Sequence, residues 1–122
     1  MKINNNMRKQ SESQEIAAHI AETAREIFGG VLKNVILYGS YARGDYDDDS
    51  DVDIMVIVDI SAADISKYRD DFAVISSRLS LRTTDCVTVS VVLQDKETFD
   101  KYKNVLPFYR NVLNEGVVLY AA

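Results

Sequence analysis

Apolar residues recur at helical spacing in two long stretches of the chain. The first stretch predicts a helix that begins at Ser11 or Ser13 and ends at Gly29-Gly30. The second predicts a helix over about residues 62–81, capped by Ser61. Residues 1–11, ahead of the first helix, are polar and predict a loose leader. The apolar positions are Ile16, Ala17, Ile20, Ala24, Ile27 and Phe28 in the first stretch, and Ile65, Tyr68, Phe72, Ile75 and Leu79 in the second.

Shorter apolar runs predict strands over residues 35–38, 51–59 and 85–93, and a strand or tail over 117–120. A helical turn at 41–43 and helices at 95–103 and 107–116 complete the pattern. We expect Cys86, the only cysteine, to be a small buried residue of the third strand. The whole pattern predicts a single α/β domain over residues 1–122, with a small mixed sheet flanked by helices.

Within the second predicted strand, Val52, Ile54, Val56 and Val58 share one face, and Met55 and Ile57 share the other. Both faces are apolar, which indicates a strand covered on both sides. Only the start of this strand carries charge.

The charge of the chain is concentrated in one window. The formal net charge is −5, from 19 acidic and 14 basic residues, and six aspartates lie between Asp45 and Asp53. The rest of the chain is nearly balanced, with 13 acidic and 14 basic residues. No basic stripe is evident, which disfavours broad nucleic-acid binding. No apolar run reaches the ~18 residues of a membrane span. Because residues 1–14 also lack the apolar core of a signal peptide, we expect a cytoplasmic protein without membrane contact.

Two carboxylates stand at the head of the second predicted strand. Asp51 and Asp53 are two positions apart, so their side chains point to the same face. Two charges at the end of an apolar strand are costly without a partner. Mg²⁺ is typically held by one or two carboxylates together with substrate phosphates. The pair therefore predicts a divalent metal site.

The end of the preceding strand offers the complementary chemistry. Gly39 allows close approach of a phosphate to the backbone, and Ser40 presents a hydroxyl and an N–H at the start of a helical turn. Arg43 is placed to reach a phosphate or to pair with Asp45 or Asp53. Phosphate donors at one strand end and metal ligands at the next are the combination that phosphoryl or nucleotidyl transfer requires.

Two segments carry a resemblance to a known family. Gly39-Ser40-Tyr41-Ala42-Arg43-Gly44 and Ser50-Asp51-Val52-Asp53, with ten residues between Ser40 and Asp51, resemble the signature of the minimal nucleotidyltransferases of the DNA polymerase β-type superfamily. The motif covers about residues 35–58. The C-terminal stretch from Leu106 to Tyr120 also resembles the end of small members of this family. The resemblance implies a polymerase β-like core.

The resemblance also implies roles for single residues. Gly39, Ser40, Arg43 and Ser50 would bind the triphosphate of ATP, and Asp51 and Asp53 would bind two Mg²⁺ ions. A third carboxylate would complete the metal site and act as base, and Asp85, which opens the third predicted strand, is the best candidate. Family members often carry this acid inside the strand, where this chain has Val87, Val89 and Ser90, so Asp85 as a strand-end acid without a role stays open.

The rest of the acidic window has plainer interpretations. Asp47, Asp48 and Asp49 are interpreted as a solvent-facing loop. A calcium loop starting at Asp45 would need glycine where Ser50 stands and glutamate where Val56 stands, which disfavours that reading.

The resemblance implies Mg²⁺-dependent transfer of AMP from ATP to a hydroxyl group. Only about 30 residues follow the third predicted strand, so we expect a partner to supply part of the substrate surface. Small members of the family typically pair with a helical HEPN-type protein, and some are antitoxins that transfer AMP to a tyrosine of that toxin. Two alternatives stay open: nucleotidyl transfer to a small molecule such as an antibiotic, and a binding module that neutralises a partner by contact. Homo-oligomerisation and the preferred nucleotide also stay open.

Overall fold

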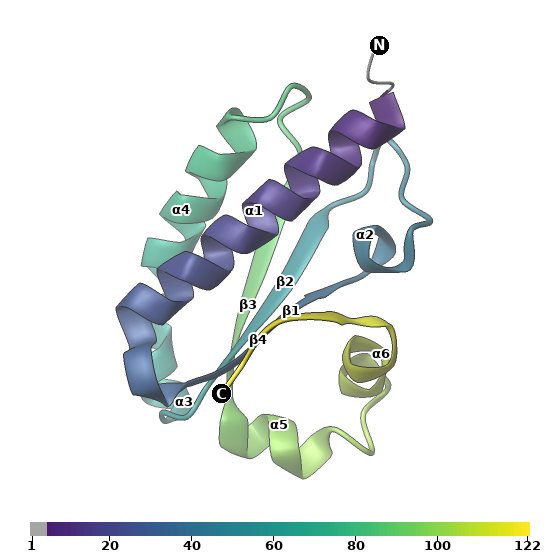
Figure 1. The fold of residues 1–122 in the computed structure, drawn as a ribbon. Coiled ribbons are helices and arrows are strands. Elements are labelled where there is room, and N and C mark those ends of the chain that lie inside the picture. The colour runs from purple at the N-terminus through teal and green to yellow at the C-terminus, as the bar shows by residue number, and fades with distance from the viewer. Residues whose placement is uncertain (1–4) are drawn as a thin grey trace.

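A four-stranded mixed sheet forms the centre of the protein. The computed structural model describes residues 5–122. The strands are β1 (Leu32–Tyr38), β2 (Val52–Val58), β3 (Val89–Asp95) and β4 (Val117–Ala121), in the spatial order β3-β2-β1-β4. β1 is antiparallel to both β2 and β4, whereas β2 and β3 run parallel. The predicted mixed sheet with flanking helices is therefore confirmed (Figure 1).

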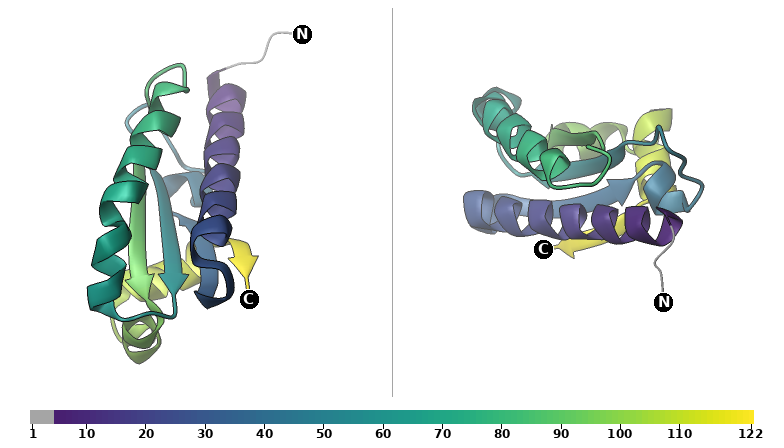
Figure 2. Two further views of the ribbon diagram at one scale, coloured as in Figure 1. Left: turned by 90° about the vertical axis from the view of Figure 1, so that its left-hand side faces the viewer. Right: turned by 90° about the horizontal axis from the view of Figure 1, so that it is seen from above.

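Each face of the sheet has its own core. Helices α1 (Asn5–Phe28) and α4 (Arg69–Leu81) cover one face, where Phe28 and Phe72 stack with ring centroids 5.8 Å apart. Helices α5 (Lys96–Tyr102) and α6 (Pro107–Glu115) cover part of the other face around Met55 and Ile57. The two views of Figure 2 show α1 and α4 running along the strands and the α5–α6 pair near one end of the sheet. The predicted division of the β2 side chains between two faces is thus confirmed.

Helix boundaries follow the sequence closely in the C-terminal half. The predicted helix over 62–81 is divided into α3 (Ala62–Ile65), a 3₁₀ turn (Ser66–Tyr68) and α4. The Ser61 side chain caps α3 by accepting a hydrogen bond from the Asp64 amide at 3.1 Å. The Asp95 side chain likewise caps α5 by accepting a hydrogen bond from the Thr98 amide. The helical turn after β1 is α2 (Ser40–Arg43), as predicted. No helix of residues 5–122 is long and apolar enough to cross a membrane.

The prediction of a loose leader over residues 1–11 is wrong for residues 5–11, because α1 already begins at Asn5. Residues 1–4 lie outside the described residues. The first turns of α1 have little apolar periodicity, so their sequence gave no helix signal. Polar contacts across the fold order them instead: Arg8 pairs with Asp85 at 2.8 Å, and Glu12 accepts a hydrogen bond from the Thr84 hydroxyl at 3.0 Å.

The start of the third strand is also displaced from its prediction. β3 begins at Val89 and not at Asp85, so Asp85 and Cys86 lie in the preceding loop. Cys86 is exposed and has a φ of 50°, which corrects its interpretation as a buried strand residue. A residue in this left-handed conformation cannot continue an extended strand, and this is why pairing with β2 starts only later.

Candidate active site

Asp51 and Asp53 lie where β2 begins, at the edge of the apolar core. Asp53 is half-buried and stands in the sheet between Tyr38 of β1 and Ser90 of β3. Asp51 is exposed and directly precedes the strand. The side chains that follow Asp53 on the same face, Met55 and Ile57, are buried, so the carboxylates mark the boundary between solvent and core.

The electrostatics of this pair are unfavourable without a cation. Burial, and then the negative charge of Asp51, raise the pKa of Asp53 above its ordinary value, while Arg43 opposes this rise. Among residues 5–122, no lysine or arginine lies within ion-pair distance of either carboxylate. Two adjacent carboxylates without a basic partner suit a divalent cation, since Mg²⁺ prefers oxygen ligands of this kind. Asp51 and Asp53 are therefore of the ligand type that Mg²⁺ requires.

Gly39 is the residue that brings the neighbouring turn against Asp53. Its φ of 79° and ψ of −160° belong to a region that essentially only glycine occupies. A Cβ atom at this position would lie 2.5 Å from Oδ2 of Asp53, which is closer than any ordinary contact. The absence of a side chain thus lets the backbone of the turn and the carboxylate share one small space. This arrangement explains physically why glycine stands there.

Ser40 and Arg43 form the two ends of α2. The carbonyl of Gly39 accepts hydrogen bonds from the amides of Ala42 and Arg43, both at 3.1 Å, so the turn closes directly beside Asp53. Arg43 pairs with Asp45 at 3.2 Å and with Glu115 of α6. Of the two partners that the sequence left open for Arg43, the structure shows Asp45 and not Asp53, whereas Glu115 is a partner that the sequence did not indicate. Ser40 lies half-exposed beside Gly39.

Ser50 is engaged within the acidic loop. Its hydroxyl accepts a hydrogen bond from the Asp47 amide at 2.9 Å, and its own amide donates to the Asp47 carbonyl at 3.3 Å. Asp47, Asp48 and Asp49 are exposed, as predicted. Asp48 pairs with Lys9 of α1, so the loop is tied to the first turns of that helix. The position of Ser50 next to Asp51 is thus fixed by the loop itself.

Asp85 does not join Asp51 and Asp53. It lies in the loop before β3 and pairs with Arg8 of α1. Within residues 5–122, no three histidine, cysteine, aspartate or glutamate side chains are grouped so that they could hold a metal ion together. The β3 residue opposite Asp53 is Ser90, so the position next to the pair in the sheet carries no acid.

Asp85 and Asp51 do border one cavity of about 200 Å³. Lys9, Tyr41 and Thr88 are among its other lining residues. The cavity therefore links the first turns of α1 with the loop that carries Asp85 and with the exposed member of the carboxylate pair.

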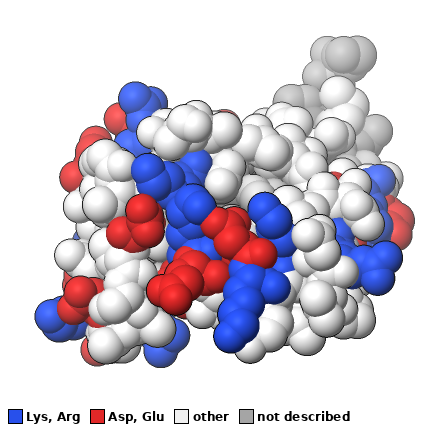
Figure 3. Space-filling model, turned by 90° about the horizontal axis from the view of Figure 1, so that it is seen from below, with Lys and Arg blue, Asp and Glu red and all other residues white. Residues whose placement is uncertain are grey.

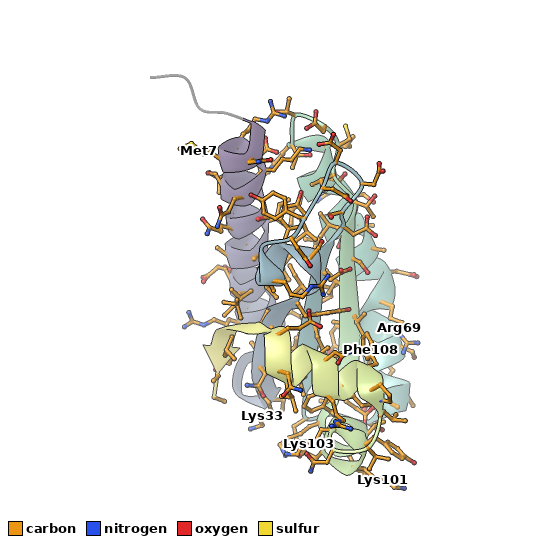
Figure 4. The ribbon with its side chains drawn as sticks, turned by 90° about the vertical axis from the view of Figure 1, so that its right-hand side faces the viewer. Met7, Lys33, Arg69, Lys101, Lys103 and Phe108 are labelled. Atoms are coloured by element: carbon orange, nitrogen blue, oxygen red, sulfur yellow. The ribbon has the colours of Figure 1, made fainter. Side chains whose placement is uncertain are left out.

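Aromatic residues on the other side of Asp53 complete the surroundings. Burial, and then the charge of Asp53, raise the pKa of Tyr38 to about 12, so its hydroxyl stays protonated at neutral pH. Its ring packs edge-on against Phe108 of α6 with centroids 5.7 Å apart, and Figure 4 labels Phe108 on α6. Phe108 remains 47% exposed. No pattern in the sequence marks Phe108 as a neighbour of the site, because its contact with Tyr38 of β1 exists only in the tertiary structure.

Comparison with known proteins shows the family to which this chain belongs. Residues 18–119 match the sequence profile described as the nucleotidyltransferase domain. The chain belongs to the nucleotidyltransferase domain family. A protein of Methanocaldococcus jannaschii named "Putative protein adenylyltransferase MJ0604" is 37% identical over 94 residues, which are 76% of this chain and 83% of the relative. A second protein of this organism, of the same description, is 40% identical over 68 residues, covering 56% of this chain and 67% of the relative.

One solved structure shares the fold of this chain. A protein of Sulfolobus solfataricus, described as a "putative nucleotidyltransferase", aligns with a TM-score of 0.57 at 20% identity and covers 98% of this chain and 90% of its own. A toxin–antitoxin structure with AMP-PNP aligns with a TM-score of 0.49 at 17% identity, over 86% of this chain and 73% of its own. The family of this chain is assigned from the sequence profile and the sequence relatives.

Family membership makes this chain a nucleotidyltransferase enzyme, as the sequence predicts. The matched residues include β1, the Gly39-Ser40 turn, the carboxylate pair and β3. The face of the molecule seen from below carries acidic and basic side chains side by side (Figure 3). The absence of broad nucleic-acid binding stays a prediction.

Proposed function

We propose that this nucleotidyltransferase transfers AMP from ATP to a hydroxyl group of a protein in a Mg²⁺-dependent reaction. The observation that carries the proposal is the pair Asp51 and Asp53, without a basic partner among residues 5–122 and directly beside the Gly39-Ser40 turn. The relatives named as protein adenylyltransferases support AMP as the transferred group and a protein as its acceptor.

The chemistry is a displacement at the α-phosphorus of ATP. The acceptor oxygen forms the new bond, the bond to the β-phosphate oxygen breaks, pyrophosphate leaves, and the hydroxyl proton passes to a base. Asp51 and Asp53 would hold two Mg²⁺ ions, which would offset negative charge on the phosphate oxygens. Gly39 and Ser40 hold the triphosphate, with Arg43 and Ser50 as further contacts. Arg43 must then give up part of its pairing with Asp45 and Glu115.

For Asp85 we propose the role of base and third carboxylate. It borders the same cavity as Asp51, but its ion pair with Arg8 has to open before it can act. Replacement by alanine tests this role: AMP transfer should fall strongly in Asp85→Ala. Transfer at the wild-type rate would show that Asp85 is only the partner of Arg8.

The acceptor we propose is a helical HEPN-type protein, with this chain as the antitoxin of a pair. The resemblance of the motif segments to small antitoxin nucleotidyltransferases supports this choice. A small-molecule acceptor such as an antibiotic remains the second candidate. The third candidate is a binding module that neutralises its partner by contact alone. The Asp51→Asn and Asp53→Asn variants of such a module would still neutralise the partner.

The test uses ATP labelled at the α-phosphate, Mg²⁺, the full chain and the protein encoded beside it in the genome. We expect the partner to acquire label from the α-phosphate and none from ATP labelled at the γ-phosphate. Label should disappear with EDTA and in Asp51→Asn and Asp53→Asn. Asp59→Asn is the matched control, because Asp59 is an exposed aspartate just beyond the opposite end of β2. Equal labelling by Asp53→Asn and Asp59→Asn would refute the proposal.

A further inference from the structure

The outer edge of β3 is an open strand edge. Among residues 5–122 β3 pairs only with β2, since it ends the order β3-β2-β1-β4. The Thr88 carbonyl accepts a hydrogen bond from the Val52 amide at 2.9 Å. The backbone N–H and C=O groups of Thr88 and of every second residue after it therefore point toward β2. The N–H and C=O groups of Val89, Val91 and Leu93 therefore point away from the sheet. An edge of this kind is a template for another extended segment.

A groove runs along this edge, between β3 and α4. Its volume is about 800 Å³, and residues of both β3 and α4 line it. Ser76 of α4 lines the groove, is 93% buried, and its hydroxyl has no hydrogen-bond partner among residues 5–122. Buried polar groups are rarely left unpaired in native proteins. Rotation of this side chain toward the groove would let the backbone of a bound chain supply the missing partner.

The groove also has a charge preference. Among residues 5–122, Arg69 at the start of α4 is the only charged residue that lines it, and no carboxylate does. Figure 4 labels Arg69 on α4. A segment with a carboxylate near one end would meet the positive charge of Arg69.

The edge is placed close to the carboxylate pair. Ser90 of β3 is the sheet neighbour of Asp53, and both side chains point to the same face. Neighbouring strands are about 4.8 Å apart, so a strand added outside β3 would lie about 10 Å from β2. Its alternate side chains would point toward α4 on one face and toward the side of Asp53 on the other. Among the hydroxyl-bearing side chains, tyrosine reaches furthest from the strand on that second face.

We propose that the protein acceptor docks as an extended segment on the outer edge of β3, with a tyrosine on the face of Asp53 and a carboxylate near Arg69. This inference rests on the proposed function and adds to it how the acceptor is recognised. Apolar or small side chains of the segment fill the groove against α4, and its backbone pairs with Val89, Val91 and Leu93.

Two substitutions outside the carboxylate site test the docking, each with a matched control. Val91→Pro removes an outward N–H, whereas Val91→Ala loses side-chain packing but keeps that donor. Arg69→Glu reverses the charge of the groove, whereas Arg78→Glu makes the same change at an exposed α4 residue that does not line it. We expect AMP transfer to the acceptor to fall about tenfold in Val91→Pro and Arg69→Glu relative to their controls. Binding of ATP with Mg²⁺ should be equal in all four.

A direct readout uses a synthetic peptide of alternating valine and threonine, with a central tyrosine and a glutamate near one end. We expect it to slow amide hydrogen exchange at Val89, Val91 and Leu93 and to bind about tenfold more weakly to Arg69→Glu than to Arg78→Glu.

Three results would overturn the inference. They are unchanged transfer in both test variants, unchanged exchange of the three amides, and a dimer in solution that Val91→Pro dissociates, which would make a second copy the occupant. Absence of any Asp53-dependent label in the wild type is a different result, because it refutes the proposed function itself.

Discussion

Gly39→Ala is expected to lower the rate of AMP transfer far more than it lowers the stability of the fold. The backbone conformation of Gly39 lies in a region that costs other residues about 1–3 kcal/mol. Its new Cβ would stand 2.5 Å from Oδ2 of Asp53, and ordinary contact begins at 3.4 Å. The carboxylate must therefore move by about 1 Å, and a misplacement of that size at a reacting centre can cost about a hundredfold in rate. A hundredfold loss corresponds to about 2.7 kcal/mol of transition-state stabilisation.

Gly44→Ala provides the control. Gly44 has a φ of 88°, and a Cβ there meets no atom within 4 Å. The substitution costs about 1–2 kcal/mol of backbone strain but leaves Asp53 in place. Thermal denaturation should show both variants losing about 4–8 °C in Tm. In the AMP-transfer assay kcat/KM should fall about a hundredfold only in Gly39→Ala. Equal kcat/KM in the two variants would refute the close packing of Gly39 against Asp53 as a requirement for catalysis.

Four further predictions concern stability, pH and exposure. Burial and the charge of Asp51 raise the pKa of Asp53, so its ionised form destabilises the fold when the pH is above that pKa. This destabilisation is lost as the pH falls through the pKa of the folded state toward 3.8. Denaturation curves over a pH series should therefore show a higher Tm for Asp53→Asn at neutral pH and no such advantage at acidic pH. Phe72→Ala, at a side chain 1% exposed, should cost about 3–5 kcal/mol in urea unfolding. Lys9→Ala removes the partner of Asp48 and should speed hydrogen exchange in residues 45–51 more than in β1. Cys86 should react with a thiol reagent in the native protein, and a buried thiol would not.

Much of the candidate site could be predicted because its parts are local in sequence. The spacing of Asp51 and Asp53 fixes a shared face, and the Gly39-Ser40 turn follows directly from the end of an apolar run. Asp85 shows the limit of this reasoning. Its place at the head of an apolar stretch predicted a strand residue, but the left-handed Cys86 and the ion pair with Arg8 keep it in a loop. Neither feature has a signal in the spacing of residues.

The amino-acid sequence was sufficient to predict the two-faced β2, the helices with an apolar stripe, and the carboxylate pair, because side-chain alternation and helical periodicity are properties of neighbouring residues. Folding in three dimensions was needed to show that α1 starts at Asn5, that Arg43 reaches Glu115, and that Tyr38 packs on Phe108. These contacts join residues far apart in the chain, and their strength depends on burial and distance that exist only after folding. The open edge of β3 belongs to the same class, since strand order, and not strand propensity, leaves it unpaired.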